Sequence, residues 1–343
     1  MSFSSDQRPA KDQRNASPVD ASRFWAVLIG IDMYSSRRLS GCVADTKAIE
    51  EYLTKDLGVQ KHRIQRLFST SSQPRTKSAV SFIHSIAKNA RTALRHLRDS
   101  FTGNSKDLPL DIESSIPTRA NIIDTLLSLS TNSEIENEYL PYEGTSVADK
   151  GSIEALSPID RTPPDSEVTI PDISDREINS ILKEISRTKG HRITLILDCC
   201  HSSGVTRSLT PQNGVRSVDP LPDTSIQDML DAAHIRLRDL PGYRSVYEGD
   251  WHPDMDSHVV LAACREYENA KERKGPNGNS WVFTQALIHT LKHGDLTEES
   301  TYLDLVRALK LPTNVKQTPI VAGKHKEARL WYQDSGFGES SSR

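Results

Sequence analysis

The sequence has few cysteines, no long apolar run and no excess of positive charge, and each shortage excludes a class of protein. Four cysteines in 343 residues are too few and too scattered for a disulfide framework, so we expect reduced thiols. No window approaches the roughly 18 apolar residues of a membrane span, and the polar start lacks the apolar core of a secretory signal. These absences predict a protein of the cytoplasm or nucleus, without a membrane partner.

Charge and glycine content narrow the choice further. The formal net charge of −3 argues against a general nucleic-acid binder, because such proteins usually carry a basic face. No glycine-rich fingerprint follows the apolar run VLIGID, which disfavours a nucleotide-binding protein. With 36% hydrophobic and 26% charged residues, the chain is long enough to bury one substantial core.

Composition divides the chain into one domain with two tails. Residues 1–22 and 334–343 are polar and serine-rich, which predicts disordered tails around a domain at 23–333. Within the domain, 73–114 is an insertion whose apolar stripe and scattered lysines and arginines predict a basic amphipathic helix, packed on its own domain. The polar segment 205–257 is predicted to be a long exposed loop.

Strands alternate with helices along this domain. Short apolar runs predict strands at 24–32, 63–68, 192–198, 258–264 and 328–332. Helical spacing and capping residues predict helices at 43–58, 118–130, 174–190, 280–294 and 301–310. This order predicts an α/β fold with a doubly wound, mainly parallel sheet and helices on both faces. In such sheets, reactive groups gather at the carboxyl ends of the strands.

The strand at 192–198 ends in a cluster of reactive side chains, DCCHSSG. A cysteine just past the carboxyl end of a central strand can present a thiolate, which is a strong nucleophile once its pKa is lowered. Two other interpretations remain open from the residues alone. Cys199 and Cys200 are small enough to be buried hydrophobes, or they bind zinc, although adjacent ligands without a second pair suit zinc poorly.

Eight segments of the chain, taken in order, resemble a known family. They read WAVLIGIDMY, LSGCVADTKAIEEYL, PTRANIID, ISDREINSIL, ITLILDCCHSSG, SHVVLAACREYENA, FTQAL and QTPIVAG. Together they resemble the caspase-like peptidases of the metacaspase type (peptidase C14), particularly fungal ones, over residues 24–332. The resemblance implies a caspase-like fold and a cysteine endopeptidase that cuts protein or peptide substrates after Arg or Lys, in proteolysis and regulated cell death.

The resemblance also implies roles for individual residues. Cys200, directly before His-Ser, falls on the nucleophile of the family. Asp198, with Cys42 and Asp45 of the GCVAD element, falls on the pocket for a basic P1 side chain, and two carboxylates in one crevice attract such a group. For Asp45, an exposed acid in the first turn of a helix is the alternative interpretation. We predict no metal site, although the resemblance makes calcium a candidate cofactor, with Asp175 among the matching acids.

The catalytic histidine of the family has no counterpart here. It belongs to an SGHG-like element that ends the strand before the cysteine strand, whereas residues 131–152 of this chain read TNSEIENEYLPYEGTSVADKGS. This segment contains no histidine and no apolar run long enough for a central strand. We therefore predict a sheet that lacks one strand and a site that lacks its general base.

The remaining histidines are poor substitutes. His258 opens a strand and should lie at the opposite end from Cys200, and His201 should point to the opposite face. His234 and His252 fall in the long polar segment. A general base must reach its nucleophile within hydrogen-bond distance. Two functions therefore remain: a cysteine endopeptidase, or an inactive pseudo-protease that binds basic peptides or other caspase-like chains.

Overall fold

The structure is a computed structural model of the chain. It describes residues 19–34, 39, 41–69, 115–136, 153–162, 166, 168–199, 224–265, 268, 270, 272–275 and 278–333. The predicted nucleophile Cys200, the predicted basic helix at 73–114 and most of the two predicted tails lie outside the described residues. Ala21, at the end of the predicted N-terminal tail, is buried in the core, so that tail is shorter than expected.

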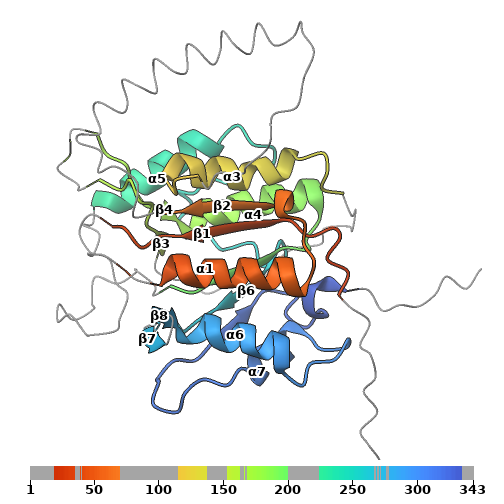
Figure 1. The fold of residues 1–343 in the computed structure, drawn as a ribbon. Helices are drawn as coiled ribbons and strands as arrows, with labels where there is room; N and C mark the ends of the chain where they lie inside the picture. Colours follow the sequence, from red (N-terminus) through yellow and green to blue (C-terminus); the bar gives the residue numbers. More distant parts are fainter. Residues whose placement is uncertain are drawn as a thin grey trace, which may run out of the picture.

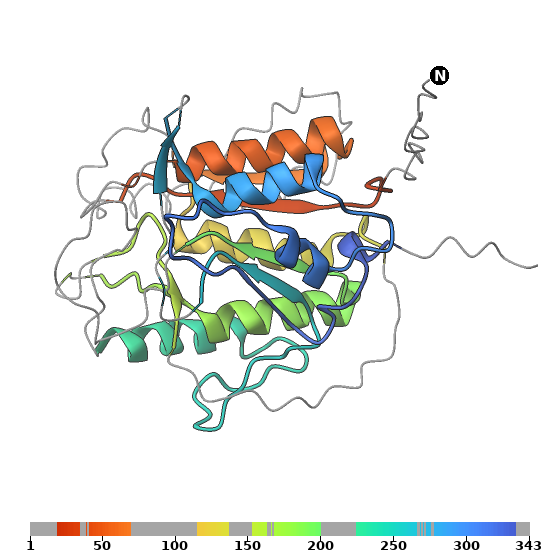
Figure 2. The same ribbon diagram turned by 90° about the horizontal axis from the view of Figure 1, so that it is seen from below.

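The strands form a layer in the middle of the molecule (Figures 1 and 2). Strand β1 (Ala26–Gly30) pairs in parallel with β2 (Ile64–Phe68). Strand β5 (Thr194–Leu197) pairs in parallel with β6 (Val259–Ala262), which pairs antiparallel with β9 (Ile320–Ala322). Two short antiparallel pairs complete the described strands: β3 (Ala155–Leu156) with β4 (Ile173–Ser174), and β7 (Glu272–Gly275) with β8 (Gly278–Trp281).

Helices cover both faces of this layer. One face packs against α3 (Arg119–Thr131), α4 (Asp175–Lys189) and the end of α5 (Thr224–Leu237). The other face packs against α1 (Cys42–Glu51), α6 (Val282–His293) and α7 (Tyr302–Ala308). The predicted α/β fold with helices on both faces is confirmed, with strands in mixed rather than purely parallel pairing. None of the described helices is long and apolar enough to cross a membrane.

Local sequence signals fix where several helices begin. The Thr118 hydroxyl accepts the backbone N–H of Asn121 at the start of α3. The Ser174 hydroxyl likewise accepts the N–H of Glu177 at the start of α4. Both caps satisfy N–H groups that the first turn of a helix leaves without a partner. The predicted starts of these two helices are therefore confirmed.

The predicted last strand and the predicted long loop are both wrong in part. Residues Leu330–Tyr332 form a short turn (η4) in which Trp331 and Tyr332 adopt left-handed φ angles of 59° and 51°. Such angles exclude an extended strand, and β9 is the last strand instead. Within 205–257, α5 is a helix and Val246 is fully buried. Apolar side chains such as Val246 hold this segment against the domain rather than leaving it exposed.

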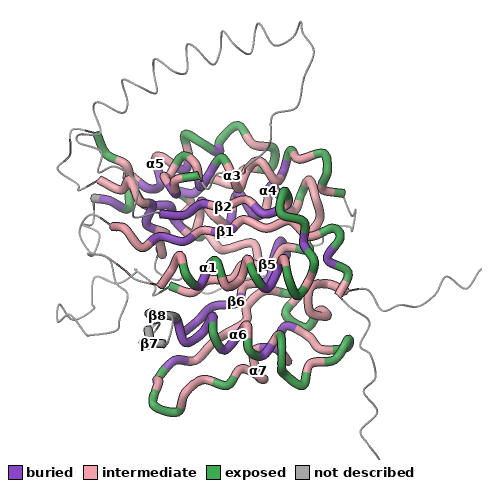
Figure 3. The backbone as a smooth tube through the Cα atoms, in the orientation of Figure 1, coloured by how far each residue is buried: buried purple, intermediate pink, exposed green. Residues whose placement is uncertain are grey.

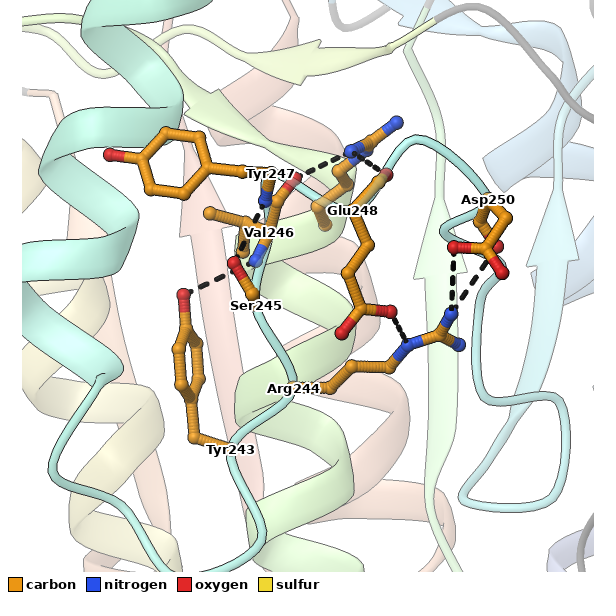
Figure 4. A network of polar contacts seen from close by, with 8 residues as sticks. Tyr243, Arg244, Ser245, Val246, Tyr247, Glu248 and Asp250 are labelled. Atoms are coloured by element: carbon orange, nitrogen blue, oxygen red, sulfur yellow. Dashed lines mark hydrogen bonds and ion pairs between the residues drawn. The ribbon is translucent and has the colours of Figure 1, made fainter.

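A polar network anchors the end of that segment to α4 (Figure 4). The Arg176 guanidinium donates to the backbone oxygens of Val246 and Glu248 and lies over the ring of Trp251, with Cζ at 5.1 Å from the ring centroid. The Tyr243 hydroxyl accepts the N–H of Val246 at 3.2 Å. Because the charged group bonds to backbone, the position of the segment does not depend on its own side chains alone.

Candidate active site

The carboxyl ends of β1 and β5 meet at one edge of the strand layer. Tyr34 follows β1, and its buried hydroxyl donates to the backbone oxygen of Ser157 at 2.8 Å. Burial raises the pKa of Tyr34 well above its usual range, and the nearby charges of Cys42 and Cys199 raise it further. Cys42 at the start of α1 and Cys199 just after β5 therefore lie within electrostatic reach of the same phenol.

An acid at the end of β1 fixes the start of α1. The Asp32 carboxylate accepts the N–H of Cys42 at 2.8 Å and the N–H of Val43 at 3.3 Å, and the Asp32 N–H donates to Ser69 Oγ at 2.7 Å. The residue before α1, Gly41, has no side chain to cap the helix, so Asp32 takes that role from another segment. Sequence reasoning missed Asp32, although the acid closing VLIGID was its signal.

The two predicted pocket carboxylates come together at the start of α6. Asp198 Oδ2 accepts the N–H of Thr284 at 3.1 Å and its hydroxyl at 2.5 Å. Asp45 Oδ2 accepts the N–H of Trp281 at 3.1 Å. Residues 281 and 284 lie one helical turn apart, so both carboxylates sit beside the same turn. Hydrogen bonds from backbone N–H groups and the positive end of the helix dipole favour the ionised form of both acids.

Asp45 is a buried acid rather than an exposed one. It lies in the first turn of α1, but only 6% of its surface is exposed, so the alternative interpretation of an exposed helix acid is wrong. Its partner Trp281 is fully buried. The site therefore contains two carboxyl groups that accept hydrogen bonds from the start of α6.

Comparison with known families fits this arrangement. A family model for the caspase domain matches residues 23–329. The chain belongs to the caspase domain family. That assignment supports a cysteine peptidase of this fold and covers nearly all of the described residues.

Other comparisons add little. The crystal structure of protein GSU0716 from Geobacter sulfurreducens is similar to the chain at 14% sequence identity and a TM-score of 0.44, over 87% of this chain and 93% of that one. No curated protein sequence matches the chain. The family model therefore carries the assignment alone.

The described cysteines of the caspase domain differ in exposure. Cys199 is exposed, Cys42 is half-buried and Cys264 is buried, with its sulfur 3.7 Å from the backbone oxygen of Glu268. Exposure contradicts the interpretation of Cys199 as a small buried hydrophobe. Among the described residues, no group of three or more His, Cys, Asp or Glu side chains is arranged to hold a metal ion; the zinc interpretation also involves Cys200, which lies outside them.

His258 lies at the other end of the strands from this edge. Val259 pairs with Thr194 at the first position of β5, so His258 precedes the ladder while Asp198 follows it. His258 is buried, its Nδ1 lies 2.7 Å from Ser257 Oγ, and burial lowers its pKa to about 4. His258 therefore lies at the opposite end of these two strands from Asp198, whereas its predicted place relative to Cys200 falls outside the described residues.

The acids that match the calcium ligands of the family are already engaged. Arg161 forms an ion pair of 3.1 Å with Asp172, whose Oδ2 also accepts the Ser157 hydroxyl at 3.0 Å. Asp160 accepts the N–H of Arg119 at 2.8 Å. Burial raises the pKa of Asp175 to about 6, which disfavours the ionised form a metal needs. These described acids do not fit a calcium site, and the chemistry below uses no metal.

Proposed function

We propose that this caspase-domain chain is a protein of the metacaspase type that binds protein or peptide substrates through an Arg or Lys side chain at P1. The supporting observation is that Asp45 and Asp198 both accept backbone hydrogen bonds from the first turn of α6. Asp198 directly follows β5. By family resemblance, Cys200 is the nucleophile and Cys42 lines the same pocket.

The charge of the pocket supports a basic substrate. Asp45 and Asp198 receive backbone hydrogen bonds from α6, and a guanidinium or ammonium group relieves the repulsion between two carboxylates that are close together. A substrate with an acidic P1 side chain meets the opposite effect. The difference between the two substrates should therefore appear in binding as well as in reaction rate.

The same charges work against catalysis. Carboxylates near a thiol raise its pKa by like-charge repulsion, and an unperturbed thiol is only a few per cent ionised at neutral pH. A histidine in hydrogen-bond reach normally offsets this, and the sequence lacks the SGHG-like element that carries the histidine of the family. Losing such a base costs about 10²- to 10⁴-fold in rate. We propose that turnover by this chain is very weak.

The missing SGHG-like element of the sequence also favours a second function. A pseudo-protease would keep the basic-side-chain pocket and use it to bind peptides or other caspase-like chains without cutting them. Binding and turnover then separate: the pocket selects Arg or Lys, whereas the cysteine reacts only with strong electrophiles. Both functions share the pocket, so the first experiment tests the pocket itself.

Activity-based labelling tests the proposal directly. An electrophilic peptide with Arg at P1 and its matched analogue with Asp at P1 are incubated with the chain, and peptide mapping locates the labelled cysteine. We expect the Arg probe to label Cys200 faster than Cys42, Cys199 or Cys264, and faster than the Asp probe does. Equal labelling of all four thiols, or equal rates for both probes, would contradict the pocket.

A further inference from the structure

Strands β1 and β5 lie in one layer and share helices on both faces. Val27 and Leu195 pack against the same cluster on α3 and α4. On the opposite face, Ile49 of α1 packs both with the cluster that contains Leu28 and with the cluster that Ile196 contacts. Two strands that contact the same helices above and below belong to the same sheet layer.

These two strands are nevertheless not paired. Among the described residues, β1 is bonded only to β2, and β5 only to β6. The Gly30 oxygen accepts the N–H of Ser69, the residue after β2, at 3.0 Å, so the peptide group of Gly30 points toward β2. Because peptide groups alternate in direction along a strand, those of Val27 and Ile29 point away from β2. Of these outward peptide groups, the Ile29 oxygen accepts a hydrogen bond of 3.5 Å from the Thr46 hydroxyl.

The same alternation applies to β5. The N–H of Ala263 donates to the Leu197 oxygen at 2.9 Å, which directs the peptide group of Leu197 toward β6. Thr194 and Ile196 therefore direct their peptide groups away from β6, toward the side where β1 lies. We call Val27, Ile29, Thr194 and Ile196 the β1–β5 edge pair.

Each residue of the edge pair keeps part of its surface exposed. Strand β6 is paired on both sides, and three of its four residues are buried (Figure 3). All four residues of β5 are only half-buried, although helices cover both of its faces. In β1, Leu28 and Gly30 are buried, whereas Val27 and Ile29 of the edge pair are half-buried. This pattern agrees with an unpaired edge on β1 and on β5 among the described strands.

We propose that the β1–β5 edge pair binds an extended apolar segment of a partner protein as an added strand. Backbone donors and acceptors on both flanks fit an extended chain, which can pair with two strands at once. Helices above and below require apolar side chains on both faces of the added strand. β1 and β5 run in the same direction. Asp32 after β1 bonds the start of α1, and Asp45 of α1 and Asp198 after β5 both bond the start of α6.

Charge at one end of the edge pair restricts the partner further. A strand parallel to β5 ends beside Asp198, which follows β5 directly. A basic residue just after the apolar stretch therefore complements the carboxylates at the start of α6. β1 spans five residues, which sets the length of the apolar stretch. The partner segment is thus a short run of apolar β-branched residues followed by Lys or Arg.

Hydrogen exchange of individual amides tests this inference in the full chain. In the free protein, the amides of the β1–β5 edge pair should exchange at least about tenfold faster than those of Leu28 and Leu195, which face paired strands. The peptide acetyl-Val-Thr-Val-Ile-Val-Lys-amide should slow the edge-pair amides by at least about tenfold and leave Leu28 and Leu195 unchanged.

Two controls decide the identity of the occupant. The same peptide, N-methylated at every second residue, lacks the donors for one flank and should give no protection. Edge-pair amides that are protected in the free protein at every concentration would mean that the chain fills the position itself. Protection that rises with protein concentration would mean a second copy. Either result overturns the proposal, as does a peptide that protects nothing or an N-methylated peptide that protects equally.

Discussion

The two ends of the strand layer carry different chemistry. At the carboxyl ends, Asp45 and Asp198 are fixed by backbone hydrogen bonds from α6. At the amino ends, His258 is buried against Ser257, and His191 stacks on His325 with ring centroids 4.2 Å apart. The two acids that we propose to select a basic side chain therefore lie at one end, and the described His258, His191 and His325 lie at the other. This separation predicts a caspase domain that keeps binding while losing turnover.

The largest expected effect comes from restoring a base to the carboxyl end. A family-type strand ending in Ser-Gly-His-Gly is inserted between Ile135 and Gly151. Turnover of Arg and Lys substrates should rise by about 10²- to 10⁴-fold, because a histidine in reach would then accept the thiol proton. Steady-state hydrolysis of a fluorogenic peptide measures the change. An insert with alanine in place of that histidine is the control, and equal activity of the two inserts would contradict the prediction.

At the amino ends of the strands, His258 should affect the pH dependence of stability rather than the reactivity of Cys200. The folded pKa of His258 is about 4, below the unfolded value of about 6.5. Its contribution is therefore fully present above about pH 6.5 and is lost as the pH falls toward 4, by about 3 kcal/mol in all. Denaturant unfolding across this pH range measures the loss, and labelling of Cys200 should not follow it.

Variant proteins isolate the part due to His258. Burial raises the pKa of Asp175 to about 6, so this acid contributes with the opposite sign, losing stability as the pH rises through the same window. Both the unmodified chain and His258→Gln contain Asp175, so the difference between their free energies of unfolding cancels its contribution. The exposed His62→Gln is the matched control and should leave the pH profile unchanged. If His258→Gln lost as much unfolding free energy toward pH 4 as the unmodified chain does, another group would be the cause.

The carboxyl end should respond to loss of one pocket charge. Asp198→Asn should slow labelling by the Arg probe by about tenfold, since one of two attractive charges is gone. It should also lower the free energy of unfolding by about 1 kcal/mol, because Asp198 bonds the first turn of α6. The α7 capping variant Asp304→Asn is the matched control: it removes a helix-capping charge remote from the site and should lose stability alone. Equal slowing by both variants would contradict a pocket role for Asp198.

Local signals in the sequence were sufficient for much of this fold. Capping residues such as Ser174 and Thr118 act within one turn of a helix, so their pattern alone predicted where α3 and α4 begin. The rule that parallel strands carry chemistry at their carboxyl ends predicted the place of Asp198, whereas Asp45 was expected beside it only from the family resemblance. The absent apolar run at 131–152 likewise agrees with the unpaired edges of β1 and β5.

Features that depend on distant contacts were not predictable in the same way. Asp32 caps α1 from another segment, and burial of Asp45 depends on Trp281, which lies far along the chain. The left-handed φ angle of Trp331 interrupts an apolar run that reads as a strand. In each case the deciding partner lies outside the window that a periodicity or capping rule examines.

The measurement that tests the account most directly is turnover by the unmodified chain. Hydrolysis of peptides with Arg or Lys at P1 is followed alongside the Cys200→Ala variant, with the Arg probe confirming that the pocket is formed. We predict that the chain is labelled by the probe but cleaves these peptides at a rate close to that of Cys200→Ala. Robust cleavage that Cys200→Ala abolishes would contradict the account, because it would require a histidine that reaches the site.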